Sequence, residues 1–243
     1  MKILNTLLSL TIVTSILKAQ NPEVSSEDFS SRQVHLDFHT SEHLENIGEK
    51  FDKASWQKAL VDAHVSSINI FAKGHHGFSY YPTKVGTQHP NLGFDLLKSQ
   101  LEASHEIGIK TPFYFAIGWS VLDAVTHPEW VIKNKNGKSK KGDLIKSLKD
   151  EDPYPNFTWE LLMPEGGYLD IILKQTEELC KNYDLDGFWY DIIPNNAINY
   201  NTYSRAGFKK AGIDIDNDLE VEMHHVEKLK FFMASCNACL LYT

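Results

Sequence analysis

The 243-residue sequence is poor in cysteine, with only Cys180, Cys236 and Cys239. Three cysteines are too few for a disulfide-stapled fold. Cys236 and Cys239 form a single CxxC pair, and a structural zinc site would need a second pair of ligands that the neighbouring sequence does not offer. A disulfide between these two cysteines is the other interpretation. The length allows one sizeable hydrophobic core.

Basic residues are also scarce, because 24 Lys and Arg face 32 Asp and Glu, for a net charge of −8. The only basic cluster, Lys133–Lys141, is interleaved with asparagine and glycine and is typical of a solvated loop. Neutralising phosphates requires a concentrated positive surface. The sequence therefore argues against a nucleic-acid partner.

Long hydrophobic runs are absent too. The longest, Leu7 to Leu17, is well short of the roughly 20 residues that span a bilayer. With Lys2 before it and Lys18-Ala19-Gln20 after it, the run predicts a signal peptide over residues 1–19, cleaved after Ala19, although an uncleaved anchor is the alternative. We expect a secreted or periplasmic protein with no membrane span after cleavage. Removing those residues leaves 22 basic against 32 acidic side chains, a net charge of −10.

No internal repeat or low-complexity region is present. Residues 20–33 are polar and serine-rich and predict a flexible lead-in. The rest, residues 34–243, alternates strand and helix patterns around a loop-rich insertion near residues 120–165. We expect strands over 34–39, 65–71, 109–117 and 186–193, and helices over 52–63, 94–107, 169–183, 204–211 and 219–233.

That order is typical of a parallel α/β fold with right-handed crossovers. Four strand–helix units are half of an eight-unit barrel. The chain also ends on an apolar run, Cys239 to Thr243, without a polar cap. We therefore expect the N-terminal part of a (β/α)8 TIM barrel, about four of its eight units, in a truncated chain.

The stretch Asp186–Ile193 is the centre of the functional prediction. It is a nearly continuous apolar run of the kind that is buried on both faces of a parallel sheet. Asp191 is the exception in this run. An ionised carboxylate in an apolar core costs roughly several kcal/mol unless it is paired or reaches solvent. The carboxyl ends of barrel strands carry the chemistry. We predict that Asp191 is catalytic; a structural cap of the next loop is the alternative.

Other strand ends carry side chains suited to hydroxyl-rich ligands, since His and Asp bind hydroxyls and an aromatic ring packs against a sugar's apolar face. Strand ends of a barrel converge on one pocket. We therefore predict six substrate-binding residues: His35, Asp37, His39, His75, His76 and Trp189.

The spacing His35-x-Asp37-x-His39 also allows a metal-dependent hydrolase, because residues 35, 37 and 39 share one face of an ideal strand. His75 or His76 would complete such a site. The same spacing equally serves residues that point into a barrel. We assign no metal and no cofactor.

Several separated motifs resemble known families. Phe51–Trp56 and Phe71–Phe78 resemble the second strand–helix region of the α-L-fucosidases of glycoside hydrolase family 29, whose Lys-His-His-Asp-Gly-Phe signature closes that strand. Here Gly74 follows Lys73, and the Asp is absent. Asp186–Asp191 is similar to their Trp-Phe-Asp strand, whose Asp is the nucleophile.

The closer resemblance is to hypothetical glycosyl hydrolase family 6, which is fucosidase-like. Arg32–Thr40, Gly77–Lys84 and His127–Trp130 look like that family's motifs, and the likeness extends over most of residues 32–215. Asn199–Tyr203 departs from the Cys-rich stretch that members usually carry after the catalytic strand.

The resemblance implies retaining hydrolysis of terminal sugars of oligosaccharides or polysaccharides, with Asp191 as nucleophile and a second carboxylic acid about 5–5.5 Å away. In the fucosidases that acid comes from a later, variable segment, so Asp37 is only a candidate stand-in. A truncated, non-catalytic carbohydrate-binding chain is the remaining alternative. The open sheet edges of a half barrel also favour a homo-oligomer.

Overall fold

The computed structural model describes residues 32–139, 160–194 and 198–242, with the backbone alone for 239–242. The predicted signal peptide and nearly all of the predicted lead-in lie outside the described residues, as does much of the insertion near 120–165. Within the described ranges, no helix has both the length and the apolar character needed to cross a membrane.

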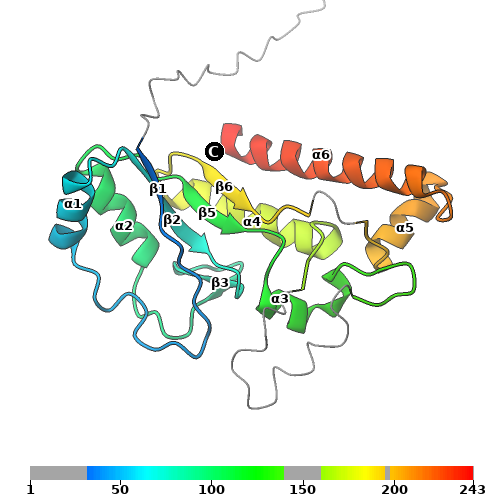
Figure 1. Ribbon diagram of the computed structural model, residues 1–243, viewed down its shortest axis with the longest axis horizontal. Coiled ribbons are helices and arrows are strands. Elements are labelled where there is room, and N and C mark those ends of the chain that lie inside the picture. The colour runs from blue at the N-terminus through cyan, green and yellow to red at the C-terminus, as the bar shows by residue number, and fades with distance from the viewer. Residues whose placement is uncertain (1–31, 140–159, 195–197, 243) are drawn as a thin grey trace, which may run out of the picture.

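The strands are β1 (Gln33–His35), β2 (Ser67–Lys73), β3 (Phe78–Ser79), β4 (Thr87–Gln88), β5 (Phe113–Ala116) and β6 (Phe188–Asp191). The helices are α1 (Lys53–Asp62), α2 (Leu96–His105), α3 (Val121–Thr126), the short 3-10 helix η1 (Pro128–Trp130), α4 (Gly166–Asn182), α5 (Thr202–Ala211) and α6 (Asp218–Tyr242). Figure 1 shows the strands side by side in the centre, with α1 and α2 at one end and α5 and α6 at the other.

The central sheet is parallel. Its order is β4-β3-β2-β5-β6, and β1 also pairs with β2. The pairs β1–β2, β2–β5 and β5–β6 are parallel, whereas the short β3 runs antiparallel to β2 at its carboxyl end. The predicted parallel α/β architecture is therefore confirmed.

Local sequence signals fix where the helices begin and end. The Asp52 carboxylate caps α1 by accepting a hydrogen bond from the backbone N–H of Ser55 at 2.8 Å, as the sequence predicts. Asp95 caps α2 in the same way through Lys98. Helix α5 ends at Gly212, which has φ +70°, a left-handed conformation that glycine adopts without strain.

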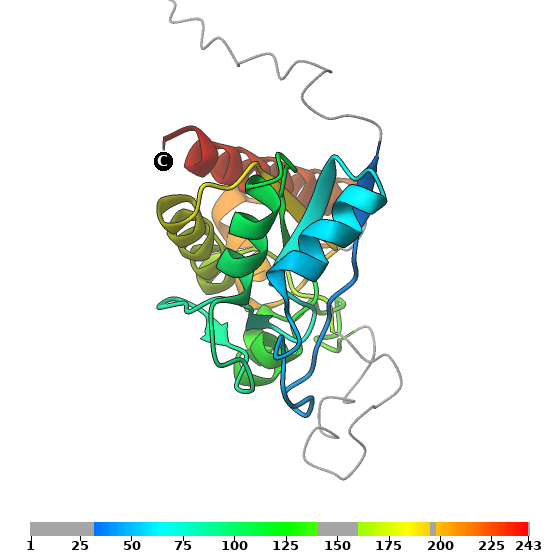
Figure 2. The same cartoon turned by 90° about the vertical axis from the view of Figure 1, so that its left-hand side faces the viewer.

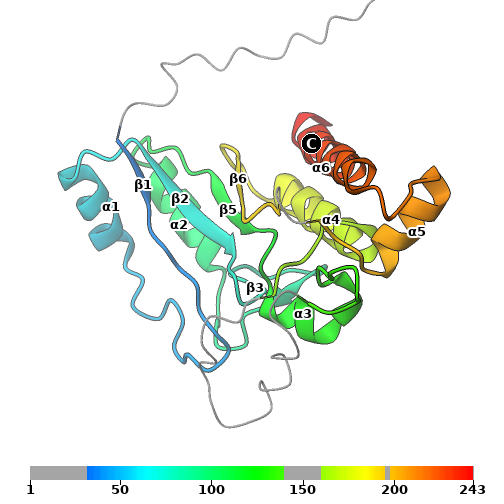
Figure 3. The ribbon, with the colours of Figure 1, turned by 45° about the vertical axis from the view of Figure 1, so that its right-hand side comes forward.

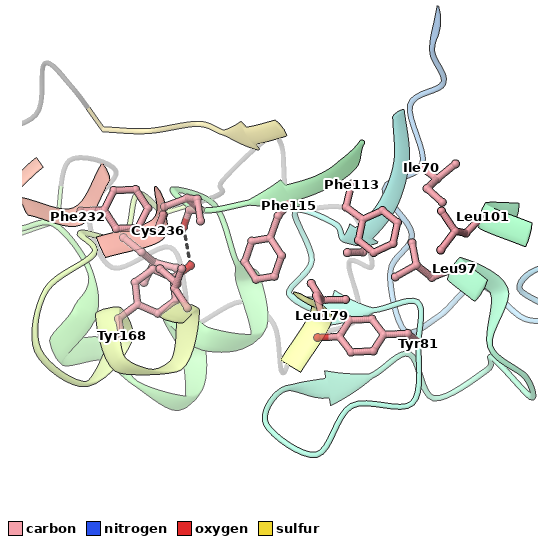
Figure 4. Close-up of a cluster of buried hydrophobic side chains, with 14 of the residues drawn as sticks. Ile70, Tyr81, Leu97, Leu101, Phe113, Phe115, Tyr168, Leu179, Phe232 and Cys236 are labelled. Atoms are coloured by element: carbon pink, nitrogen blue, oxygen red, sulfur yellow. Dashed lines mark hydrogen bonds between the residues drawn. The ribbon is translucent and has the colours of Figure 1, made fainter. Parts of the chain in front are cut away.

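One face of the sheet is covered by α1, α2 and α4, which follow one another around it in the side view of Figure 2. Alternate strand residues, including Ile70, Phe113 and Phe115, are buried against Leu97, Leu101 and Leu179 of these helices. Figure 4 shows these side chains meeting in one continuous layer. Burying a Leu or Phe side chain contributes about 1.5–3 kcal/mol.

Helix α6 extends the same layer. It packs against α4, and the two lie side by side in Figures 1 and 3. Phe232 and Cys236 of α6 are fully buried in the core, close to Tyr168 of α4 in Figure 4. The ring of Phe232 also contacts Tyr190 of β6, at 6.2 Å between centroids.

The opposite face of the sheet carries the other alternate residues, because side chains of a strand alternate between its two faces. The register aligns Phe71 with Tyr114, Tyr114 with Trp189, and Ala116 with Asp191. This surface, which we call the open face, holds the candidate site.

Three expectations differ from the structure. The first strand is shorter than predicted, because it leaves the sheet after His35, although residues 37 and 39 were expected to continue it. The short β3 and β4, and the helices α3 and η1 within the predicted loop-rich insertion, are additions. The prediction that Asp186–Ile193 is buried on both faces is wrong, since Trp189 is 51% exposed. Its physical reason is that β6 ends the strand order and only its Phe188–Tyr190 face has helices against it.

Candidate active site

Asp191 is the last residue of β6 and lies on the open face. The parallel ladder fixes its backbone, because the N–H of Ile117 donates to the carbonyl of Asp191 at 2.9 Å. Its side chain is 35% exposed. One carboxylate oxygen, Oδ2, accepts a hydrogen bond from the Tyr114 hydroxyl at 2.6 Å. Asp191 is therefore held by a neighbouring strand while remaining open to solvent.

The backbone immediately after Asp191 is strained. Ile192 has φ +54°, a left-handed conformation that is unusual for a β-branched residue. Gly118 lies directly against it, and a Cβ on Gly118 would come within 1.8 Å of the Ile192 carbonyl oxygen. Strained backbone persists only where its surroundings enforce it, and it clusters at functional sites. The close contact between these two chain segments sets the position at which β6 ends beside Asp191.

Tyr114 connects Asp191 to His75. The Tyr114 hydroxyl oxygen lies 2.7 Å from Nε2 of His75. Because the single hydroxyl proton is donated to Asp191, Tyr114 accepts from His75, which therefore carries its proton on Nε2. Burial, with the hydrogen bond to Asp191 and its negative charge, raises the pKa of Tyr114 well above its usual value. Tyr114 thus stays a donor at any working pH.

His75 is a neutral imidazole at neutral pH. Its side chain is 7% exposed, and burial is the main reason that its pKa falls to about 4. The neighbouring His39 lowers the pKa further, and the negative charges of Asp191 and Asp37 only partly oppose these effects. Nε2 of His75 lies 3.7 Å from Asp191 Oδ2, with Tyr114 bonded to both.

The residues after β1 meet around Asp37. Nε2 of His39 lies 2.8 Å from Asp37 Oδ1, and Nε2 of His35 lies 3.9 Å from the same oxygen. The Asp37 side chain is 72% exposed, whereas that of His39 is 12% exposed. The His39 ring stacks on the His75 ring with centroids 3.5 Å apart and planes 15° from parallel. Although residues 37 and 39 lie outside the strand, the structure brings them to His75.

Aromatic rings form the surface between these groups. The His35 ring lies 6.1 Å from Trp189, 5.3 Å from Tyr114 and 5.5 Å from Phe71, all centroid to centroid. Phe71 and Tyr114 stack at 4.1 Å. Trp189 is 51% exposed and the His35 side chain 40% exposed, so these two rings form the solvent-facing part of the group.

His76, predicted to join His75 in the site, has a different environment. Burial is again the main cause that lowers its pKa to about 4, but the charged group that most opposes this shift is Glu42. His39, His89 and His43 lower it further. The structure thus connects His75 to Asp191 through Tyr114, whereas the charges that act on His76 include those of Glu42, His43 and His89.

Lys73, which begins the predicted signature, is almost fully buried on the helix side of the sheet. Its Nζ pairs with Asp123 Oδ2 at 2.8 Å, and Ser120 donates to the same oxygen at 2.6 Å. The register shifts between Phe71 and Lys73, which places Lys73 beside Phe115 rather than on the open face. Lys73 therefore holds α3 against the sheet and is not part of the candidate site.

The metal alternative depends on three or more ligands that converge. In the described part of the chain, no group of three or more His, Cys, Asp or Glu side chains is arranged to hold a metal ion. The Nδ1 atoms of the two histidines have protein partners: Nδ1 of His35 is within 3.2 Å of the Asn69 amide, and Nδ1 of His39 accepts from the backbone N–H of His75 at 3.0 Å.

Tyr114 was not among the predicted site residues. It lies inside an apolar strand, Phe113–Ala116, within the strand expected over residues 109–117. The available signal was its parity, because Tyr114 alternates with Phe113 and Phe115, which face the helices, and so shares a face with Ala116. Once β5 is aligned beside β6, that face is the one with Asp191.

A cavity of about 500 Å³ lies between the loop that follows β1 and helix α2. Its wall is formed by Phe38, Glu45, Asn46, Gly48, Glu49, Lys50, Phe51, Leu96 and Gln100. None of the predicted site residues lines it.

Comparison with known proteins identifies relatives of this chain. The model of the family described as hypothetical glycosyl hydrolase 6 matches residues 52–192. Among solved structures, α-L-fucosidase isoenzyme 2 from Paenibacillus thiaminolyticus is 33% identical with a TM-score of 0.77, covering 86% of this chain and 30% of that one. No curated protein matches the chain.

Two further solved structures are distant by both measures. α-L-fucosidase isoenzyme 1 from the same organism is 23% identical with a TM-score of 0.42, covering 59% of this chain and 31% of that one. A GH29 α-L-fucosidase from Bacteroides thetaiotaomicron is 22% identical with a TM-score of 0.40, covering 74% and 32%. The chain thus spans about a third of the length of the solved structures it resembles.

Proposed function

The chain belongs to the hypothetical glycosyl hydrolase 6 family, and from this we propose that it is a retaining, α-L-fucosidase-like glycoside hydrolase whose nucleophile is Asp191. The observation that carries the proposal is the position of Asp191 at the carboxyl end of a parallel strand. There it is partly exposed, bonded to Tyr114 and beside Trp189. The likeness to a fucosidase supports fucose as the sugar.

The contacts of Asp191 divide its two oxygens by role. Oδ2 accepts the Tyr114 hydroxyl, so Oδ1 is the oxygen that attacks the anomeric carbon. In a retaining mechanism this attack forms a covalent glycosyl-enzyme, which water then hydrolyses.

The binding roles follow the exposed surface. Trp189 packs against the apolar face of the sugar, and His35 and His76, which both reach solvent, bind its hydroxyls. His39 contributes through its contact with His75. No cofactor is needed for these steps.

Export is a further proposal, supported by the sequence pattern at the N-terminus. A signal peptide over residues 1–19 sends the protein to the periplasm or outside the cell, and the mature chain begins at Gln20. Intact-mass measurement of protein recovered from the culture medium or periplasm tests this directly; a mass that retains residues 1–19 contradicts it.

Hydrolysis of aryl glycosides by the purified protein tests the proposed activity, with the α-L-fucoside first. Wild type is compared with Asp191→Ala and with the matched control Asp170→Ala, an exposed aspartate of α4. We expect Asp191→Ala to lower kcat by several orders of magnitude, roughly 10³ or more, and the control to match wild type. Unchanged turnover in Asp191→Ala removes Asp191 from the mechanism. Sugar binding without any turnover by wild type favours the non-catalytic alternative.

A further inference from the structure

His39 has both ring nitrogens bonded within the protein. Nδ1 accepts the backbone N–H of His75 at 3.0 Å, so that nitrogen carries no proton. The proton of the neutral ring is therefore on Nε2, which donates to Asp37 Oδ1 at 2.8 Å. The tautomer of His39 is set by these two partners.

The stacked rings transmit this geometry toward Asp191. His39 lies flat against His75 at 3.5 Å, and His75 donates to Tyr114, which donates to Asp191. These contacts form one series that begins at Asp37, outside the sheet, and ends at the proposed nucleophile. A rotation of the His39 ring therefore changes the orientation of the stacked His75 ring and of the hydrogen bond that His75 donates to Tyr114.

The charges in this series constrain its protonation. Burial lowers the pKa of His39 as it does that of His75, and Asp37 is the strongest opposing charge on His39. Two stacked imidazoles cannot both be protonated without strong repulsion. A carboxylate on the outer side of the stack holds His39 in place without placing a second positive charge beside His75.

We propose that Asp37 is a positioning residue for the glycosidase reaction: through its hydrogen bond to His39 it fixes the stacked ring of His75 and so the Tyr114 hydroxyl on Asp191. This role differs from the two that the sequence suggests for Asp37. The Asp37 oxygen that accepts the N–H of His39 has no proton of its own to give to a leaving group in this geometry. The kinetic part of the proposal rests on the proposed function, whereas the hydrogen-bond part does not.

The kinetic test compares Asp37→Ala, Asp37→Asn and the matched control Asp170→Asn on a series of aryl α-L-fucosides with different leaving groups. Asp37→Ala removes the acceptor, and we expect kcat to fall about 10- to 100-fold, as when an outer partner of a functional histidine is lost, with KM little changed. Asp37→Asn keeps a carbonyl acceptor and is expected to recover most of the loss.

Each rival role gives a different pattern. For a general acid, the loss grows with the pKa of the leaving group, and Asp37→Asn is as impaired as Asp37→Ala. For a direct sugar ligand, KM rises while kcat is unchanged. A loss in kcat that is equal across leaving groups and restored by Asn supports positioning; either other pattern overturns it.

A second measurement does not depend on activity. Nitrogen-15 NMR of the imidazoles reports the tautomer of His39 at neutral pH. We expect an unprotonated Nδ1 and a hydrogen-bonded Nε2–H in wild type, in Asp37→Asn and in the Asp170→Asn control. Asp37→Ala should keep the unprotonated Nδ1, which still accepts the His75 N–H, but lose the hydrogen-bonded Nε2–H signal. A protonated Nδ1 in wild type overturns the proposal. A protein without glycosidase activity that still shows this pattern refutes the proposed function and leaves the hydrogen-bond series standing.

Discussion

At the scale of single residues, the site is organised by the hydroxyl of Tyr114. It is the group that contacts both the proposed nucleophile and a buried histidine, at 2.6 Å from Asp191 Oδ2 and 2.7 Å from His75 Nε2. The hydroxyl donates to Oδ2 of Asp191, so Oδ1 is the carboxylate oxygen that Tyr114 does not engage. The orientation of the nucleophile therefore depends on a tyrosine that comes from a different strand.

Tyr114→Phe is expected to lower kcat by about 10- to 100-fold, because Asp191 loses the donor that orients it. The unfolding free energy should also fall by about 1–3 kcal/mol, since the variant loses the two hydrogen bonds that the hydroxyl makes with Asp191 and His75. Steady-state kinetics and urea unfolding measure the two effects.

The matched control is Tyr183→Phe, because the Tyr183 hydroxyl donates to Asp95 Oδ2 at 2.7 Å, away from the open face. That variant should lose stability without losing kcat. Equal kcat values in the two variants would contradict the role assigned to Tyr114.

Stability should depend on pH through His75. Its pKa is lowered from about 6.5 when unfolded to about 4 when folded, chiefly by burial, so the unfolded chain binds more protons between these values. The contribution of His75 to the unfolding free energy therefore has its full value above about pH 6.5. It declines by about 3 kcal/mol as the pH falls toward about 4.

Urea unfolding of wild type and His75→Gln at pH 7 and pH 4.5 checks this dependence. The variant should lose less stability than wild type between the two values, whereas the exposed-residue control His43→Gln should behave as wild type. An identical pH dependence in His75→Gln would show that the buried imidazole is not responsible.

The sequence drew attention to Asp191 as a carboxylate at the end of an apolar strand and to His75 as a polar residue at another strand end. Tyr114 could not be singled out in the same way, since tyrosine is as common in a buried strand as at a site. Its role depends on the pairing of β5 with β6, which joins residues 77 positions apart. That pairing is not encoded in local spacing.

At the scale of elements, β6 is held at both of its ends. Before the strand begins, Asp186 Oδ2 accepts from the backbone N–H of Thr111 at 2.6 Å and lies 2.8 Å from His105 Nε2, while Lys110 Nζ lies 3.0 Å from Oδ1. Burial raises the pKa of Asp186, but these hydrogen bonds outweigh it and hold the pKa below its usual value. At the carboxyl end, Gly118 fits against Ile192.

Asp186→Ala should destabilise the fold by about 3 kcal/mol, because it removes the partner of several buried or partly buried donors. The control Asp184→Ala changes an exposed carboxylate two residues away and should be nearly neutral. Thermal and urea unfolding provide the comparison. A loss below about 0.5 kcal/mol in Asp186→Ala would show that the cluster does not hold β6.

The order of elements could be predicted from the sequence, because α1, α2 and α4 each bury an apolar stripe and begin near recognisable signals such as Asp52. The extent of β1 and the exposure of β6 could not. Period-two alternation continues past His35, but pairing with β2 stops at Asn69, and only the paired sheet shows where the strand ends. The exposure of Trp189 depends on what covers the open face and not on its own sequence.

At the scale of the whole molecule, apolar surface lies outside the core. In the described part of the chain, β6 pairs on one side, with β5, and so presents an edge. Helix α6 exposes Leu219, Met223 and Phe231, each at least 60% exposed, on its side away from α4. Open edges and exposed apolar side chains favour association.

We therefore expect this chain to self-associate as its concentration rises. Substituting glutamine for both Met223 and Phe231 should reduce that association without changing net charge, whereas Asn237→Gln on the same helix should not. Light scattering coupled to size-exclusion chromatography measures the mass directly. A wild-type chain that stays monomeric over the whole concentration range would contradict this expectation.

The most direct test of the account is chemical rescue of Asp191→Ala by azide, with an activated aryl α-L-fucoside as substrate. Azide occupies the space of the missing carboxylate and attacks the same carbon from the same side. We predict that azide restores turnover and gives the fucosyl azide of inverted configuration, while wild type gives fucose with retained configuration. An active wild type whose Asp191→Ala variant is not rescued, or a wild-type product of inverted configuration, would show that Asp191 is not the nucleophile.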